Sequence, residues 1–174
     1  MSANDVLFTP TEAAVLTRLP LKAVNNAIDK DMVPTATRDS TRLLDPRALL
    51  ALVLEKRLEG RLFPELRRRL FAALLASPRN VISLEDGTVT VKVDLRQPRR
   101  ELAARLKALR RARVLIASDR EIMGGDPVFR GTRVSVHLIG TLLEQGGTEA
   151  QILEAYPRLT GEMIRLATVY AQAY

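Results

Sequence analysis

The chain has 174 residues, of which 47% are apolar, so it can bury a substantial core in one ordinary domain or in roughly two to three small ones. It has no cysteine, a single histidine (His137) and no apolar run near the roughly 20 residues of a membrane span, so we expect a cytoplasmic protein without metal or cofactor. The net charge of +7 suggests a polyanionic or acidic partner.

Two short helices are predicted at the start of the chain. The segment Thr9-Pro10-Thr11-Glu12 predicts a capped helix start, because the threonine hydroxyl and the glutamate carboxylate can each accept a hydrogen bond from the other's amide. The first helix should run from about Pro10 to Leu16, with a tight turn at residues 17–19 and a second helix from Pro20. The apolar stripe of that second helix is Leu21, Val24 and Ile28.

A hairpin and a third helix are predicted next. Pro34 ends the second helix, and the segment TATRDSTRLL, with its polar and β-branched residues, has the composition of a wing or hairpin. Asp45-Pro46 caps a third helix that continues to about Glu59. This order of elements is that of a winged helix-turn-helix.

The segments FTPTEAAVLTRLPLKAVNNAID and VPTATRDSTRLLDPRALLAL resemble the excisionase and MerR-type DNA-binding domains over roughly the first 58 residues. That family often has glycine where this chain has Arg18, and an aromatic residue where it has Ala27. The resemblance implies that the second helix enters the major groove of DNA. A protein-binding module is the alternative, since residues 1–60 carry no net charge.

The DNA-binding candidates follow from the groove chemistry of these residue types. Asparagine can bond adenine in a bidentate way, and arginines in the wing can hold phosphates or enter the minor groove. The candidates are Thr11, Lys22, Asn25, Asn26, Lys30, Arg38 and Arg42.

The whole basic excess lies in residues 61–113, which carry 14 basic and 5 acidic side chains. Residues 62–76 predict an amphipathic helix with three arginines, and a second basic helix should run from Pro98 to near Arg113. The segment VLIAS after it is predicted to be a short buried strand. The arginines form either a solvated helix face or a functional patch, and both interpretations stay open.

Between these helices, NVISLEDGTVTVKVDL alternates apolar and polar residues around the hairpin dipeptide Asp86-Gly87. One face of the predicted hairpin carries Val89, Val91 and Val93. A hairpin of this size needs a helix or a second chain to cover it, so we expect a homodimer that forms through this sheet.

The last third of the chain predicts three short helices. The segment GGDPVFRGTRVSVHLIG lacks the spacing of a phosphate-binding loop, and His137 within it is interpreted as an ordinary structural or surface residue. Capping residues Thr148 and Thr160 open the second and third helices. The expected fold is mainly α with small β elements, divided into a winged helix-turn-helix (1–60), a helix-hairpin-helix region (61–117) and a trihelical, helix-turn-helix-like domain (118–174).

Residues 124–171 resemble the bacterial domain-of-unknown-function family 433, through GGDPVFRGTRVSV, the following apolar helix and ILEAYPRLT. The family usually has proline where this chain has Ser135. Its members are commonly antitoxins of VapBC-like pairs, encoded beside a toxin with a PIN-type ribonuclease fold. Gly131-Thr132-Arg133 is then expected to be a fixed turn rather than a catalytic loop.

The resemblance also gives the arginines a second use, because an arginine fork can pair with the metal-binding carboxylates of such a nuclease. The toxin-binding candidates are Arg67, Arg68, Arg69, Arg110, Arg111, Arg113, Arg130 and Arg133. We therefore expect a non-enzymatic antitoxin that binds both its operator and a PIN-type ribonuclease toxin. The alternatives are a stand-alone transcriptional regulator without a toxin and, third, an enzyme.

Overall fold

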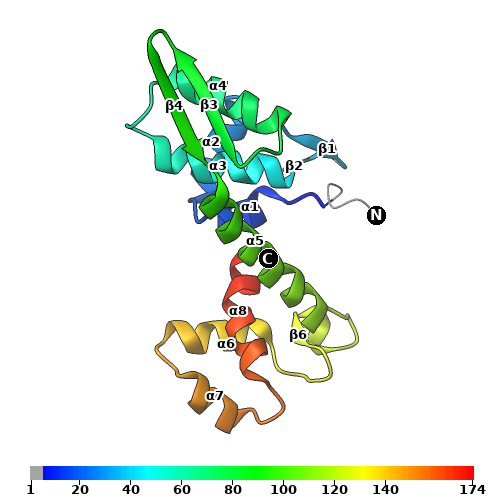
Figure 1. Cartoon of the computed structure of the whole chain (residues 1–174). Coiled ribbons are helices and arrows are strands. Elements are labelled where there is room, and N and C mark those ends of the chain that lie inside the picture. The colour runs from blue at the N-terminus through cyan, green and yellow to red at the C-terminus, as the bar shows by residue number, and fades with distance from the viewer. Residues whose placement is uncertain (1–5) are drawn as a thin grey trace. The chain divides into compact units, whose positions relative to one another are not determined.

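The computed structural model describes residues 6–174 (Figure 1). This part of the chain contains eight α-helices and three antiparallel two-stranded sheets, which confirms the prediction of a mainly helical fold with small β elements. The chain forms two compact units, one up to Ala104 and one from Arg105 to Tyr174. Their boundary lies within helix α5 (Arg96–Leu115).

The first helix begins where its capping residues predict, and the second begins at Leu21, one residue after the predicted start. Helix α1 (Pro10–Thr17) is capped by Thr9, whose hydroxyl accepts from the Glu12 amide at 3.2 Å, while the Glu12 carboxylate accepts from the Thr9 amide at 2.9 Å. Arg18 ends α1 in the left-handed conformation, with φ 58°. Helix α2 (Leu21–Asp29) follows after three residues.

The expected hairpin follows α2. Strand β1 (Ala36–Arg38) pairs with β2 (Thr41–Leu43), and both turn residues, 39 and 40, have positive φ, as a tight two-residue turn requires. The backbones of Phe8 and Leu44 then exchange two hydrogen bonds of 2.9 Å each. Both side chains are fully buried, so the chain segment before α1 is fixed to the segment after the hairpin.

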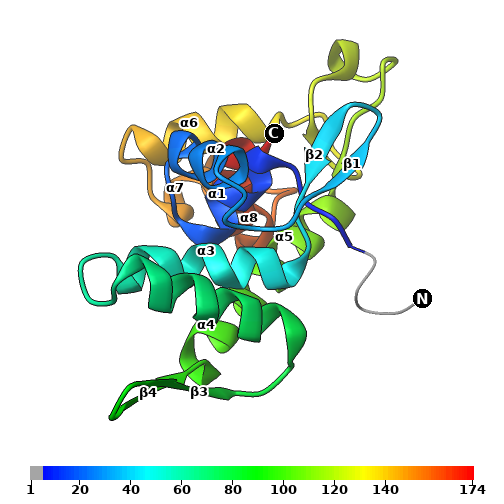
Figure 2. The same ribbon diagram turned by 90° about the horizontal axis from the view of Figure 1, so that it is seen from above.

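Helix α3 (Pro46–Leu58) is the centre of the first unit. Asp45 caps it as predicted, because its carboxylate accepts from the Ala48 amide at 2.7 Å. Seven consecutive residues, from Ala48 to Leu54, are buried, so α3 is covered on all sides. Figure 2 shows α3 between the α1–α2 pair and α4 (Pro64–Ala76).

The second hairpin packs on α4, on the side away from α3 (Figure 2). Ile82 and Leu84 are buried, and their strand partners Val93 and Val91 are half-buried on the same face. Val89 shares this face near the turn but is 59% exposed. A helix of the same chain therefore covers the hairpin, and a homodimer stays a prediction. The strands are β3 (Val81–Asp86) and β4 (Val89–Asp94).

The turn of this hairpin lies one residue later than the sequence predicts. Asp86 pairs with Val89, so the loop residues are Gly87 and Thr88. Gly87 adopts φ 59° at the first loop position, a conformation that favours glycine. Of the two loop residues only Gly87 has a positive φ, and a hairpin turn of this type requires glycine at the first loop position, which is the physical reason for the difference.

Helix α5 starts two residues before the predicted Pro98, because the Asp94 carboxylate accepts from the Arg96 amide at 2.9 Å and stabilises the first turn. The helix continues to Leu115, so the prediction of a strand over VLIAS is wrong for its first two residues. The strand that remains is β5 (Ile116–Ala117), which pairs antiparallel with β6 (Val128–Phe129). A short 3₁₀ helix, η1 (Met123–Gly125), lies between these strands in the sequence.

Three capped helices form the second unit, as the sequence predicts. The hydroxyls of Ser135, Thr148 and Thr160 each accept a hydrogen bond from an amide in the first turn of the helix that they precede. The helices are α6 (Val136–Glu144), α7 (Glu149–Ala155) and α8 (Gly161–Ala173). Their common core contains Phe129, Val136, Ile139, Ile152, Leu159, Ile164 and Ala167.

The Gly131-Thr132-Arg133 segment is a fixed turn, as predicted. The Thr132 amide donates to the Phe129 carbonyl at 2.9 Å, and Gly131 occupies the third position of this turn with φ 79°. The Thr132 hydroxyl also donates to the Phe129 carbonyl at 2.8 Å and accepts from the Val134 amide at 3.1 Å. The turn is therefore held by backbone and side chain together.

We expect Gly131→Val to destabilise the second unit by roughly 1 to 3 kcal/mol, because a β-branched residue is strained at this positive φ. Crowding at the Cβ itself is not expected, since no atom beyond the glycine and its chain neighbours lies within 4 Å of an added Cβ. Gly131→Asn is the control, because asparagine tolerates the left-handed region. Thermal unfolding followed by circular dichroism measures both variants, and equal melting temperatures for the valine variant and the wild type would contradict the argument.

Two neighbouring arginines of α4 should differ in their effect on stability. Arg67 pairs with Glu55 of α3, and the two side chains are only 17% and 23% exposed, whereas Arg68 is 74% exposed. Arg67→Ala should lower the free energy of unfolding by about 1 to 3 kcal/mol, because it leaves the Glu55 carboxylate half-buried without its partner. Arg68→Ala should cost less than about 0.5 kcal/mol. Urea titrations that give the same midpoint for both variants would refute this difference.

Candidate functional site

Helix α2 has one buried face and one exposed face. The buried face consists of Val24, Ala27 and Ile28, each at most 5% exposed. On the opposite side, Lys22 and Asn26 are exposed and Asn25 is half-buried. In residues 6–174 these three polar side chains have no hydrogen-bond or ion-pair partner. They are therefore available to a ligand outside the chain.

Leu21 belongs to the exposed side of α2 as well, which the sequence analysis missed. It is 42% exposed, so its assignment to the apolar stripe is wrong. It lies one helical turn before Asn25 and therefore next to it on the helix surface. An exposed apolar side chain at such a place can contact a thymine methyl group. The spacing of four residues between Leu21 and Asn25 is the sequence signal that could have placed Leu21 on the exposed side of α2.

An ion pair links the first hairpin to the end of α2. Arg42 of β2 forms an ion pair with Asp29 at 2.7 Å, so its charge is partly compensated within the chain. Arg38 of β1 is 79% exposed, and its guanidinium lies 4.0 Å from the Asp39 carboxylate. Thr11 is exposed in the first turn of α1. Of the two hairpin arginines, Arg38 is thus the more accessible.

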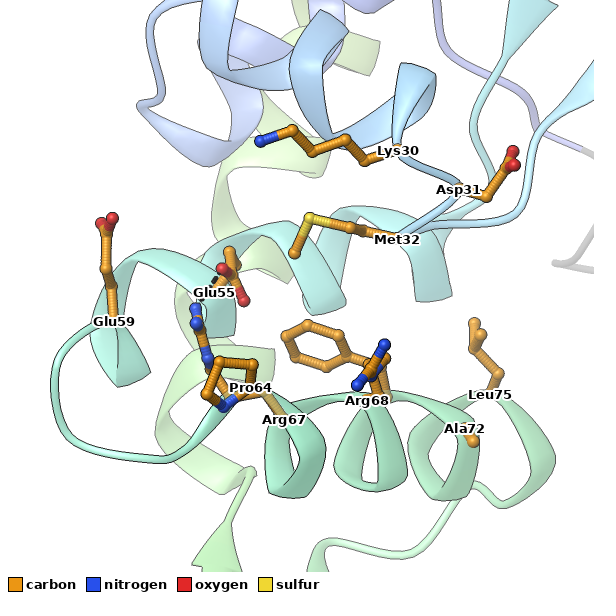
Figure 3. A pocket seen from close by; sticks show the side chains of 11 residues that line it. Lys30, Asp31, Met32, Glu55, Glu59, Pro64, Arg67, Arg68, Ala72 and Leu75 are labelled. Atoms are coloured by element: carbon orange, nitrogen blue, oxygen red, sulfur yellow. Dashed lines mark hydrogen bonds and ion pairs between the residues drawn. The ribbon is translucent and has the colours of Figure 1, made fainter.

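A hollow of about 660 Å³ lies beside the end of α2, between α3 and α4 (Figure 3). Lys30 lines this hollow, and Figure 3 shows its side chain together with that of Met32 on the side opposite α4. The charged lining residues are Lys30, Arg67, Arg68, Asp31, Glu55 and Glu59. Three cations thus face three carboxylates, and the hollow has no net preference for a charged ligand.

The three candidate arginines of α4 all have partners within the first unit. Arg67 pairs with α3, and Arg68 pairs with Glu65 of its own helix at 2.5 Å. Arg69 donates to the Glu85 carbonyl at 2.6 Å and lies 3.6 Å from the Asp86 carboxylate. These contacts link α4 to α3 and to the second hairpin.

The arginines in the last turns of α5 differ among themselves. Arg111 donates two hydrogen bonds to Glu162 of α8, at 2.7 and 3.1 Å, and this guanidinium holds the pKa of the Glu162 carboxyl below its usual value. Arg113 donates to the Tyr174 hydroxyl at 2.5 Å, and its guanidinium carbon lies 5.9 Å from the centre of that ring. Arg110 is exposed and has no partner in residues 6–174.

Arg130 and Arg133 lie on either side of the Gly131 turn. The Arg130 amide donates to the Leu115 carbonyl at 2.8 Å and its guanidinium to the Val114 carbonyl at 3.1 Å, so its charge sits at the C-terminus of α5, where a cation is favourable. Arg133 is exposed without a partner in the described part of the chain. Arg110 and Arg133 are thus the two candidate toxin-binding arginines whose side chains form no hydrogen bond or ion pair within residues 6–174.

Residues 6–174 contain no group of three or more His, Cys, Asp or Glu side chains that could hold a metal ion. His137 is exposed on α6. None of the helices in this range is long and apolar enough to cross a membrane.

Comparison with known proteins gives a family but no activity. Residues 116–171 match DUF433, described as a protein of unknown function. The chain is 36% identical over 189 residues to the uncharacterized protein y4eO of Sinorhizobium fredii (strain NBRC 101917 / NGR234), a match that covers 99% of this chain and 84% of y4eO. The X-ray crystal structure of Rv2018 from Mycobacterium tuberculosis matches 95% of this chain and 98% of that chain at 14% identity, but its TM-score is only 0.31. Since the match to y4eO spans nearly the whole chain and contains the DUF433 segment, the chain belongs to the DUF433 family of proteins of unknown function.

Proposed function

We propose that this protein is a non-enzymatic antitoxin that binds operator DNA through its first unit and a PIN-type ribonuclease through its second. In this proposal, α1, α2, the β1–β2 hairpin and α3 act as a winged helix-turn-helix, and α2 enters the major groove. The DUF433 segment, residues 116–171, supplies the antitoxin part, as the resemblance to antitoxins of VapBC-like pairs implies.

The exposed face of α2 is the observation that carries the DNA-binding proposal. Lys22, Asn25 and Asn26 have no partner among the described residues, while the other face of the same helix is buried in a core of apolar side chains. A rigid helix that presents unpaired asparagines suits base recognition, because the amide can both donate to and accept from adenine. Arg38, on the β1–β2 hairpin, is 79% exposed, and this exposure supports its proposed contact with a phosphate or the minor groove.

In the second unit, two of the candidate toxin-binding arginines are free to bind a partner protein. Arg110 and Arg133 are exposed and unpaired among residues 6–174, so their guanidinium groups can form bidentate hydrogen bonds with carboxylates of a nuclease. The other six candidate arginines already have contacts within the chain. This observation favours a second candidate function, a stand-alone transcriptional regulator that inhibits no toxin.

We expect Asn26→Ala to weaken binding to operator DNA by roughly 1 to 3 kcal/mol and to relax its sequence preference, because a bidentate base contact is lost. Arg38→Ala should instead weaken binding to all sequences alike, and it should lower the slope of the logarithm of the binding constant against the logarithm of the salt concentration by about 1. Fluorescence anisotropy with duplex DNA from upstream of the gene, at two salt concentrations, measures both effects.

Asn80→Ala is the matched control for these variants, because Asn80 is an exposed asparagine of the same unit that lies outside α2. Its affinity should equal that of the wild type. Binding that does not depend on salt, or an equal loss in Asn26→Ala and Asn80→Ala, would remove the support for a recognition helix.

Arg110→Ala and Arg133→Ala should each release the activity of the ribonuclease encoded beside this gene, because truncation of a desolvated arginine in an interface costs about 2 to 5 kcal/mol. Operator binding should be unchanged, since both residues belong to the second unit. Ribonuclease assays on co-expressed pairs provide the measurement.

Arg158→Ala serves as the control, because Arg158 is also exposed and unpaired in the part of the second unit that the structure describes. Full inhibition by the Arg110→Ala/Arg133→Ala double variant would show that these residues are not the contact. Failure of the wild-type protein to inhibit the neighbouring ribonuclease, together with intact operator binding, would favour the stand-alone regulator.

A further inference from the structure

A second hollow in the first unit is lined by four arginines. It has a volume of about 420 Å³ and lies where the end of α3 meets the end of β4 and the first turns of α5. Its guanidinium groups belong to Arg57, Arg61, Arg96 and Arg100, and its one carboxylate to Asp94. Buried apolar side chains, among them Leu54 and Pro98, form part of the lining.

Carboxylates compensate only half of the positive charge of the arginines in this hollow. Arg96 donates to the Asp94 carboxylate at 2.6 and 3.0 Å. Arg57 pairs with Glu101 at 2.6 Å. The remaining two arginines, Arg61 and Arg100, have no ion-pair or hydrogen-bond partner of the side chain in residues 6–174. Four cations and two carboxylates therefore leave an excess of two positive charges.

This excess persists at any ordinary pH. Hydrogen bonds from the side chain and the backbone amide of Arg96 lower the pKa of Asp94 to about 2. The Asp94 carboxylate is therefore ionised, and its negative charge is one of the two in this balance. Arginine side chains stay protonated throughout this range. The hollow also lies at the N-terminus of the 20-residue helix α5, where the aligned peptide dipoles of the helix add partial positive charge.

A purely structural role accounts for part of this arrangement. Arg57 lies in the last turn of α3 and Arg61 four residues further on, and one cation near a helix C-terminus complements the helix dipole. Such a role does not require Arg100, which belongs to the N-terminal end of another helix. The hollow beside α2, by contrast, has equal numbers of cations and carboxylates. Of these two hollows, only the arginine-lined one has an excess of positive charge.

We propose that this hollow binds a small molecule through a diphosphate or a phosphate monoester. A phosphate monoester carries about two negative charges and a terminal diphosphate about three, and both match the planar donor fork of arginine. The volume lies at the lower end of the roughly 300 to 1,000 Å³ of small-molecule sites, and the apolar lining can contact the organic part of the ligand. The site is distinct from the exposed face of α2, so it does not depend on the DNA-binding proposal.

Isothermal titration of the full-length protein with pyrophosphate and with ADP tests the proposal. We expect saturable binding of either probe at one site. Arg61→Gln and Arg100→Gln should each weaken it by about tenfold, since each removes a hydrogen bond between charged groups. Asp94→Asn should tighten binding, because it removes a negative charge but keeps an oxygen that accepts from the Arg96 amide. Arg79→Gln, at an exposed arginine of the same unit outside the hollow, should bind like the wild type.

Two results would overturn the proposal. The first is no saturable binding of either probe, and the second is equal affinity in Arg79→Gln and in the Arg61→Gln/Arg100→Gln double variant. If neither probe binds and the double variant loses affinity for duplex DNA, the hollow holds a backbone phosphate of DNA instead of a small molecule. Circular dichroism of each variant verifies that the exposed substitutions leave the fold intact. Asn26→Ala tests the recognition helix separately, so failure of one proposal is distinguishable from failure of the other.

Discussion

The burial of α3 on all sides is the constraint on which the rest of the first unit depends. Seven consecutive buried residues, from Ala48 to Leu54, can be covered only if other elements pack around the whole helix. The α1–α2 pair covers one side and α4 the other, and α4 in turn covers the second hairpin. Full burial of one leucine contributes about 1.5 to 3 kcal/mol, so the four leucines of this run outweigh any exposed ion pair of the unit.

This packing also decides which arginines are free. Since α4 lies against α3, Arg67 meets Glu55, and since the second hairpin lies against α4, Arg69 meets the Glu85 carbonyl. In the second unit, the approach of α8 to the end of α5 brings Glu162 to Arg111. Most of the basic side chains in residues 61–113 therefore make contacts within the chain. The proposed binding sites use the guanidinium groups that this packing leaves unpaired.

Two kinds of site emerge in the first unit, and they differ in chemistry. The exposed face of α2 offers neutral amides and one lysine, a set suited to base edges rather than to strong charge attraction. The arginine-lined hollow offers four guanidinium groups around a small concave space, a set suited to a compact anion. The first surface is proposed to recognise sequence, and the second to recognise a phosphate group.

The sequence by itself determined the helices and turns, because their signals are local. Thr9, Asp45 and Thr148 cap the helices that they precede, and Gly131 adopts the positive φ that its turn needs. Tertiary structure alone decided the exposure of Leu21, because this exposure depends on which face of α2 the neighbouring helices cover. It also decided that Arg61 and Arg100 lie at one hollow. An ion pair or a cavity joins residues far apart in the sequence, and no local pattern records which helices meet.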